Sequence, residues 1–175
     1  MHRLTRLFYC CLLLASCSKD TDRANNLPQD EFIQAYFNHR ETQGQTYIDP
    51  YRQIERPGDN LEAIIIEEIA TAQSSIELAV YELNLPLVAQ ALARKHRDGV
   101  EVRVILDNDY SQSFTELNST EISQLNQHNR QKYEQLFQLI DLNQDHELSS
   151  AEVAQQDALT ILKQVGVKVI DDTAD

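Results

Sequence analysis

The chain has 175 residues, 42% of them hydrophobic, and a formal net charge of -13 at pH 7. This length suits one domain with room for an appendage, and the apolar fraction is large enough to bury a core. The negative net charge argues against sequence-independent binding of nucleic acid, because such binding needs a basic surface that displaces counterions from the phosphates. We therefore expect no stable nucleic acid binding, although nucleic acid stays open as a substrate.

The N-terminal residues have the pattern of a targeting segment. Arg3 and Arg6 supply a positive region, residues 7–14 supply an apolar stretch of signal-peptide length, and Cys17 closes the small-residue sequence LASC. The apolar stretch is too short to span a membrane. The LASC sequence resembles a bacterial lipobox, which implies cleavage before Cys17. The alternative is an ordinary secretory peptide with a chance cysteine.

Residues 1–16 are accordingly predicted to be a lipoprotein signal peptide. Acylation of the Cys17 thiol would anchor the exported protein by lipid to a bacterial membrane, which places it in the cell envelope. Cys10 and Cys11 lie in the segment that cleavage removes. No thiol is then left to form a disulfide.

Residues 17–29 are polar and are expected to form a tether. The next segment, Asp30–His39, has apolar residues at helical spacing and predicts a short helix packed on the core. The residues at that spacing are Phe32, Ile33, Tyr36 and Phe37. Tyr47–Tyr51 is expected to be extended and Pro57-Gly58 to form a turn.

The pattern between Asn60 and Asp107 predicts a helix followed by a crossover unit. Asn60 is expected to cap an amphipathic helix that starts at Leu61. An apolar run then predicts a buried strand, and a second β-branched run that ends at Asp107 predicts another. Between them lies a helix with a cationic end at Arg94–Arg97. Strand, helix and strand of this length predict two parallel strands joined right-handedly.

Local signals mark the ends of the crossover helix. Asn84 is expected to cap the helix, Pro86 suits its first turn, and Gly99 stops it. The cationic end is expected to complement the helix dipole; the alternative is a phosphate site.

The run SIELAVYELNLPLVAQALARKHRDGVEVRVILDN resembles the N-terminal part of a phospholipase D superfamily domain. The helix before it and Ala158–Asp171 after it resemble the neighbouring helix and strand of that family. The resemblance implies an α/β fold, part of an α/β/α sandwich, over residues 30–107 and 158–175. It also implies phosphodiester hydrolysis on phospholipid or nucleic acid. A generic α/β domain is the alternative, since Gly-Val turns are common in such proteins.

Residues 108–157 interrupt this resemblance and are predicted to be a helical insertion. The apolar residues Tyr133, Leu136, Phe137 and Ile140 mark one helical face within it. A polar helical segment is expected to start at Thr120 with Glu121.

The sequence DLNQDHELSSAE directly after Ile140 resembles an EF-hand calcium loop. In such a loop, oxygen ligands at positions 1, 3, 5, 7, 9 and 12 surround the ion. The corresponding residues are Asp141, Asn143, Asp145, Glu147 through its backbone carbonyl, Ser149 through water, and Glu152 as the bidentate carboxylate. His146 stands at the sixth position, where a positive φ favours Gly, and a left-handed residue there costs about 1 to 2 kcal/mol.

The alternative for this segment is an Asx-rich turn followed by a capping box of Ser149 and Glu152 without a metal. A lone loop also lacks the partner hand, so we expect weak calcium binding, with a Kd of about 10⁻⁴ to 10⁻³ M.

The family resemblance implies catalysis by a motif of the form H-x-K-x4-D. None of the five His residues in the chain is followed two positions later by Lys, so no catalytic residue is predicted. Two functions remain open. One is the N-terminal, catalytically incomplete portion of a lipid-anchored, calcium-binding phosphodiesterase, which would meet its phospholipid or nucleic acid substrate in a longer form. The other is a non-catalytic calcium-binding lipoprotein.

Overall fold

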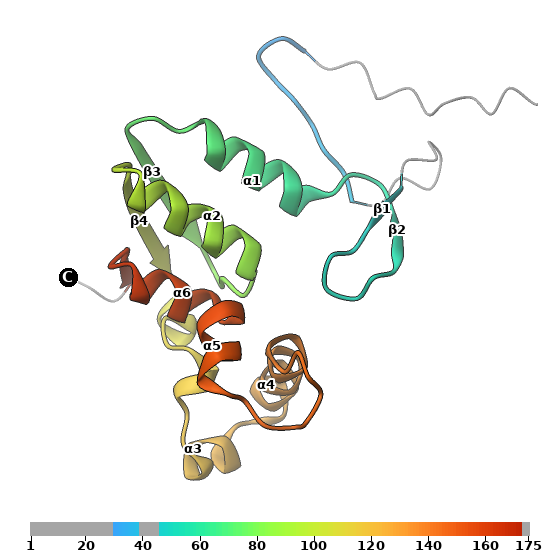
Figure 1. Cartoon of the computed structure of the whole chain (residues 1–175), viewed down its shortest axis with the longest axis vertical. Helices are drawn as coiled ribbons and strands as arrows, with labels where there is room; N and C mark the ends of the chain where they lie inside the picture. The colour runs from blue at the N-terminus through green and yellow to red at the C-terminus, as the bar shows by residue number, and fades with distance from the viewer. Residues whose placement is uncertain (1–29, 39–45, 173–175) are drawn as a thin grey trace, which may run out of the picture.

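The computed structural model describes residues 30–38 and 46–172. The fold is mixed α/β, with two small sheets and helices between and beside them (Figure 1). The predicted signal peptide, Cys17 and the tether at residues 17–29 lie outside the described residues. None of the helices in the part that the structure describes is long and apolar enough to cross a membrane.

The crossover unit has the predicted parallel arrangement. Strand β3, Ser75–Val80, leads into helix α2, Pro86–Arg97, and then into strand β4, Glu101–Leu106. β3 and β4 pair in parallel, and strand β5, Lys168–Asp171, pairs in parallel with the other edge of β4. The three-stranded sheet therefore has the order β3-β4-β5.

Side-chain alternation on β4 decides which face of the sheet is buried. Val102, Val104 and Leu106 are almost fully buried, whereas Ile105 between them is 41% exposed. This is the period of two expected of a strand that covers a core on one side. Gly99 enters the strand with φ +91°, which a residue without a Cβ adopts at no steric cost.

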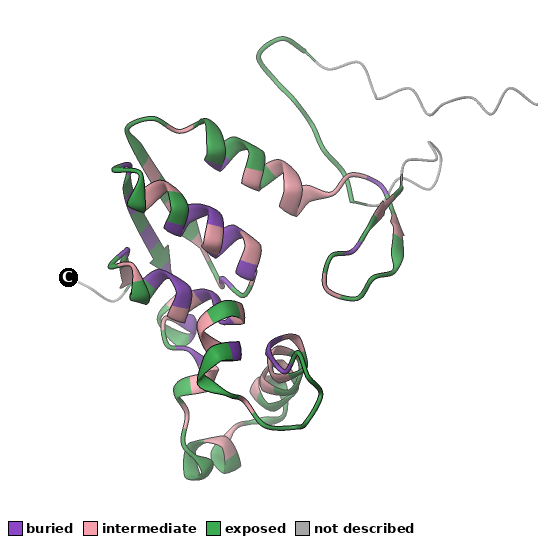
Figure 2. Ribbon diagram, in the orientation of Figure 1, coloured by how far each residue is buried: buried purple, intermediate pink, exposed green. Residues whose placement is uncertain are grey.

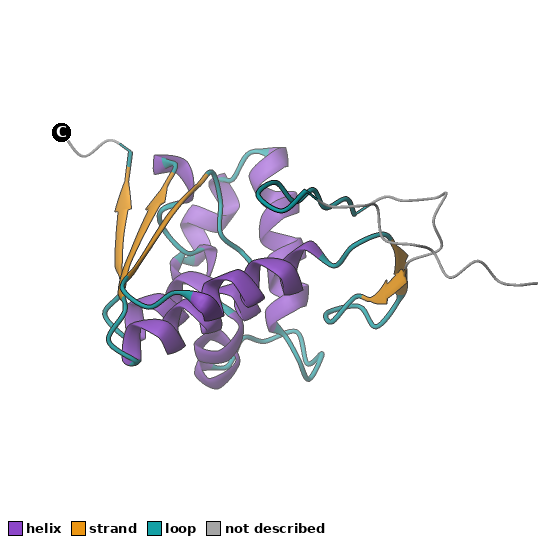
Figure 3. Ribbon diagram, turned by 90° about the horizontal axis from the view of Figure 1, so that it is seen from above, coloured by secondary structure: helices purple, strands orange, loops and turns teal. Residues whose placement is uncertain are grey.

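Three helices cover the buried face of the sheet (Figure 3). Helix α1 is Leu61–Thr71, and helix α6 is Ala158–Gln164 on the other side of α2. Leu92 of α2 and Leu162 of α6 are both 0% exposed. Figure 2 shows the buried residues gathered on α2, α6 and the strands. The predicted cap of α1 is confirmed, since the Asn60 side chain accepts a hydrogen bond from the Ala63 amide at 3.1 Å.

The predicted cap of α2 is wrong. The N-cap residue is Leu85, which offers no side-chain acceptor, and Asn84 instead donates to Glu82 at 3.5 Å. The Tyr51 side chain lies close to the Leu87 amide, so a residue from outside the crossover unit approaches one free donor of this helix end. Pro86 occupies the first helical position, as predicted.

The predicted helix at Asp30–His39 is also wrong. Its described part, residues 30–38, contains no helix, and Phe32 is 87% exposed. A helix of this length is marginal without a surface to pack on. The backbone is instead held in extended form at Phe37, which exchanges two hydrogen bonds of 2.8 Å with Asp59. A Cβ on Gly58 would lie 2.6 Å from the backbone of Asn38, so this approach requires glycine.

Strands β1, Thr46–Ile48, and β2, Glu55–Pro57, form an antiparallel hairpin next to α1. The predicted extended segment Tyr47–Tyr51 is confirmed only as far as Ile48, because residues 50–52 form the hairpin turn. Of the predicted turn Pro57-Gly58, Pro57 ends β2 and the chain bends at Gly58, which has φ +93°. Asp49 closes the hairpin loop because its Oδ1 accepts from the amides of Tyr51 at 2.9 Å and Arg52 at 3.1 Å.

The segment between β4 and α6 is helical, as predicted. It contains the 3₁₀ turns η1 (Asn108–Tyr110) and η2 (Phe114–Glu116) and the helices α3 (Ser119–Gln124), α4 (Gln127–Ile140) and α5 (Ser150–Gln156). Helix α3 begins slightly before the expected Thr120, because Asn118 caps it and forms a capping box with Glu121.

Candidate functional site

The loop Asp141–Glu152 joins α4 to α5, and both of its ends are built into helix caps. The Asp141 amide donates to the Phe137 carbonyl at 2.9 Å and ends α4, while Ser149 caps α5. Asp141 and Glu152 are each only 7% exposed. Two carboxylates are therefore held at the base of one loop, although its other residues face solvent.

The oxygens of the first half of the loop converge on a few backbone amides. The Asp145 amide donates to Asn143 Oδ1 at 2.8 Å and to Asp141 Oδ1 at 3.2 Å. The second Asp141 oxygen accepts from the His146 amide at 3.0 Å. The Asn143 amide group donates to Asp145 Oδ2 at 2.9 Å. Three predicted ligand side chains thus belong to a single network.

Glu152 connects the end of the loop to its beginning. Its Oε1 accepts from the amides of Leu142 at 3.0 Å and Asn143 at 3.3 Å. Its Oε2 accepts from the Ser149 hydroxyl at 2.6 Å and the Ser149 amide at 3.0 Å. These hydrogen bonds, with the Ser149 hydroxyl first, lower the pKa of Glu152 below its ordinary value.

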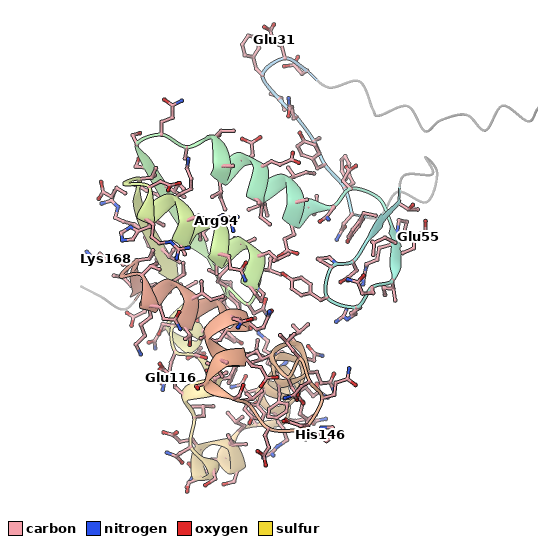
Figure 4. The ribbon with its side chains drawn as sticks, viewed as in Figure 1. Glu31, Glu55, Arg94, Glu116, His146 and Lys168 are labelled. Atoms are coloured by element: carbon pink, nitrogen blue, oxygen red, sulfur yellow. The ribbon has the colours of Figure 1, made fainter. Side chains whose placement is uncertain are left out.

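The sixth position of the loop has the predicted left-handed backbone. His146 has φ +65°, and it lies on the outer rim of the loop (Figure 4). Gln144 has φ +60°, which was not predicted. Glutamine is not among the residues enriched at positive φ, so only the comparison with other calcium loops could have indicated it.

The six predicted ligand residues are brought together in part. The side chains of Asp141, Asn143, Asp145, Ser149 and Glu152 share the hydrogen-bond network, whereas Glu147 joins it through its backbone amide, which donates to Asp145 Oδ1 at 2.8 Å. Within residues 30–38 and 46–172, no three His, Cys, Asp or Glu side chains are grouped to hold a metal ion. The capping box of the alternative interpretation is present. Calcium binding stays a prediction.

A second cluster lies at the carboxyl end of β3, where the segment between β4 and α6 meets the sheet. The rings of Tyr81 and Tyr110 lie 4.7 Å apart at 54°. Lys132 of α4 places its Nζ 3.9 Å from the centre of the Tyr110 ring and 2.6 Å from Glu82 Oε2. A cation over an aromatic ring is attracted by the ring quadrupole.

The electrostatics of this cluster favour a charged lysine. Partial burial lowers the pKa of Lys132, but its hydrogen bonds to Glu82 and Tyr110 raise that pKa by more, and the net shift is upward. The hydrogen bond with Tyr110 is also the main reason that the pKa of Tyr81 is raised. Lys132 therefore fastens α4 to the strand end. The sequence did not reveal this pair, since Lys132 and Glu82 are 50 residues apart.

The carboxyl ends of the strands are linked to one another as well. The Asp107 amide donates to the Tyr81 carbonyl at 3.4 Å, and the Asp172 amide donates to the Leu106 carbonyl at 3.1 Å. The Asp172 carboxylate accepts from the Asn108 amide at 3.0 Å. Ligand sites of open α/β sheets form at this edge. Arg94–Arg97, by contrast, lies at the C-terminal end of α2, where it complements the helix dipole.

Comparison with known proteins identifies a family. A family model described as "Cardiolipin synthase, PLD-like domain" matches residues 65–170. A mitochondrial cardiolipin hydrolase from Xenopus laevis is 46% identical over 46 residues, which are 26% of this chain and 22% of that protein. One from Xenopus tropicalis is 51% identical over 39 residues, or 22% of this chain and 19% of that protein. The chain spans about a fifth of the length of these curated relatives.

Proposed function

Because this chain belongs to the phospholipase D-like family, we propose that it serves as the scaffold of a phosphodiesterase that hydrolyses phospholipid or nucleic acid. The observation that carries the proposal is the family match over residues 65–170, which contains the crossover unit and all three parallel strands apart from the last residue of β5. The names of the two relatives favour phospholipid as the substrate.

None of the 175 residues is assigned a catalytic role. The family's H-x-K-x4-D motif does not occur in these 175 residues. A covalent mechanism needs an activated nucleophile, and residues that act as one catalytic unit cannot be removed piecemeal without losing nearly all of the rate. We therefore expect the purified 175-residue chain to leave a phosphodiester substrate unchanged.

The test compares this purified chain with the natural protein captured from its source cells by an antibody to the chain. Both are given vesicles of anionic phospholipid, a single-stranded oligonucleotide and bis-p-nitrophenyl phosphate. The natural protein should hydrolyse at least one of them, and the purified chain none. The proposal would be overturned if the natural protein hydrolysed none of the three substrates. So would turnover by the purified chain that survives replacement of each His.

We further propose that the loop Asp141–Glu152 binds one calcium ion. The donor set supports this, because carboxylate and amide oxygens are the ligands of a hard cation. Three of the predicted ligand side chains already converge on one amide network. Calcium would have to displace the hydrogen bonds that Glu152 now accepts, which agrees with the weak affinity expected of a lone loop.

Titration calorimetry of the wild type, Glu152→Gln and His146→Gly tests the calcium site. Glu152→Gln should abolish binding because it removes the bidentate carboxylate. His146→Gly should tighten binding by up to about tenfold, since it relieves the strain of a left-handed residue in the bound loop. The greater flexibility of the free loop would offset part of this gain. Heat that persists unchanged in Glu152→Gln would place the ion elsewhere.

We also propose that Cys17 is acylated and anchors the protein in a bacterial cell envelope. The support is the LASC sequence after the apolar stretch. Expressed in a bacterium with labelled palmitate, the wild type should take up label and Cys17→Ala should not. Equal labelling of the wild type and Cys17→Ala would contradict this proposal.

The loop favours a second function, that of a non-catalytic calcium-binding lipoprotein. This candidate predicts natural protein that binds calcium and is acylated but hydrolyses none of the three substrates. The same captured material therefore decides between the two functions.

A further inference from the structure

A cleft of about 470 Å³ lies between the β1–β2 hairpin and helix α4. Its walls come from the hairpin loop at residues 49–52, the start of α1 at residues 60–62, and the face of α4 that carries Lys132, Leu136 and Leu139. Figure 1 shows the hairpin beside the N-terminal end of α1. The volume falls in the range of sites for small molecules, about 300 to 1,000 Å³.

The family match covers only one part of the cleft wall. The hairpin and the start of α1 precede position 65, where the match begins, whereas α4 lies inside the matched range. The cleft is also separate from the calcium loop, since none of its lining residues lies between Asp141 and Glu152. A ligand for it must be inferred from its own side chains.

The negative charges in the cleft wall all have partners. Asp49 lies 3.5 Å from Arg56, Glu62 accepts a hydrogen bond from the Tyr51 hydroxyl, and Glu82 lies 2.6 Å from Lys132. Burial and the hydrogen bond to Glu62 also raise the pKa of Tyr51, so this phenol stays neutral. The described residues of the wall therefore offer no carboxylate without a partner to a cation.

Among the described residues of the wall, Arg52 carries the one positive charge without a direct ion pair, although this charge also acts on Asp49. The Arg52 guanidinium has no hydrogen bond or ion pair with any residue that the structure describes, and its side chain is exposed at the cleft. Its backbone is fixed, because its amide donates to Asp49 at 3.1 Å in the closed hairpin loop. A guanidinium held this way can pair in a fork with a carboxylate or a phosphate.

Apolar side chains form another part of the cleft wall, beside the polar Glu82, Lys132 and Gln135. Its partly buried apolar side chains come from α1, the start of α2, η2 and α4, and they are Leu61, Leu85, Phe114, Leu136 and Leu139. Removing their remaining apolar surface from water would favour a hydrocarbon chain laid against them, at about 25 cal/mol per Å². The wall thus combines a cation that suits an anion with apolar surface that suits an alkyl chain.

We propose that this cleft binds a single-chain anionic amphiphile, whose head group pairs with Arg52 and whose alkyl chain lies along the leucines of α4. The head group is a phosphate monoester or a carboxylate, since the guanidinium fork fits both. Nucleic acid fits poorly, because a strand needs a run of cations and a stacking platform, whereas the cleft has a single cation without a direct ion pair among its described residues.

Calorimetry with dodecyl phosphate and dodecanoate, each below its micelle concentration, tests the proposal on the full chain. Both should bind with a stoichiometry of one, and the tighter of the two identifies the head group. Arg52→Gln should weaken binding by at least about tenfold, and it should change the melting temperature little, because Arg52 is exposed and makes no direct ion pair. Arg97→Gln, which removes an exposed charge far from the cleft, is the matched control and should bind as the wild type does.

A second variant tests the apolar end of the cleft. Leu139→Asn should weaken binding of dodecyl phosphate and leave the head-group pairing intact. The proposal is overturned if Arg52→Gln and Arg97→Gln bind equally well, or if inorganic phosphate binds as tightly as dodecyl phosphate. Binding of an oligonucleotide that depends on Arg52 would also overturn it. Because the experiment measures binding, its outcome does not depend on whether the protein has phosphodiesterase activity.

Discussion

The crossover unit at residues 75–106 and the predicted insertion at residues 108–157 bury different kinds of side chain. All the residues classed as buried in the crossover unit are apolar, and they include Leu92 and Val104 at 0% exposure. In the insertion, four buried residues are polar or charged and two, Tyr110 and Ile140, are hydrophobic. The four are Ser113, Asp141, Glu152 and Asp157.

The difference shows two ways of holding a segment in place. The free energy gained by burying apolar side chains is roughly proportional to the buried area and does not depend on a particular partner. Apolar side chains can therefore form one continuous core. A buried carboxylate is stable only when donors satisfy it, and those donors must be in defined positions. Asp157 illustrates this, because it accepts from the Ser113 hydroxyl and from the Thr160 amide at 2.7 Å, and so ties η2 to the start of α6. The insertion is therefore held by few, directional contacts.

The largest effect is expected in the crossover unit. Leu92→Ala should lower the free energy of unfolding by about 2 to 5 kcal/mol, because it leaves a cavity among fully buried neighbours. Ile105→Ala, on the exposed face of β4, is the control and should cost under about 1.5 kcal/mol. Urea denaturation followed by circular dichroism measures both. Equal losses would mean that the sheet is covered on both faces in solution.

Asp157→Ala is expected to cost less, about 1 to 3 kcal/mol, because it removes a helix cap and leaves the Ser113 hydroxyl without its acceptor. Asp157→Asn keeps an acceptor and should recover part of the loss. Hydrogen exchange should locate the effect in η2 and the first turn of α6, and leave β3 and β4 protected. Exchange that rises uniformly over the chain would contradict the distinction between the two regions.

The smallest effect concerns acid stability of the loop. The pKa of Glu152 is lowered in the folded state, so its carboxylate stabilises the fold above the ordinary pKa of a glutamate. This contribution is lost as the pH falls through the lowered pKa. The difference in unfolding free energy between wild type and Glu152→Gln should therefore shrink between about pH 6 and about pH 3.

Thermal unfolding over this pH range, without calcium, measures that difference. Glu147→Gln is the matched control, since it removes an exposed carboxylate from the same loop. A difference that stays constant with pH would show that the Glu152 carboxylate makes no net contribution to the fold.

The pattern of residues was enough to predict the elements of the crossover unit and the α/β class. Alternating β-branched residues, a helical spacing of apolar residues and a glycine at the turn are local signals, and each acts through its immediate neighbours. The same holds for the Asn60 cap and for the left-handed residue at His146. Most of the residues of the candidate calcium loop were likewise predictable, because their spacing lies within one short segment.

Only the tertiary structure decided how distant segments meet. The 30–38 segment has the apolar spacing of a helix, yet no surface packs on that face, and the chain is extended there. The N-terminus of α2 is met by Tyr51 and not by Asn84, and Lys132 reaches Glu82 across 50 residues. The cleft at Arg52 arises in the same way. Such contacts depend on where the core places each surface, so no local pattern encodes them.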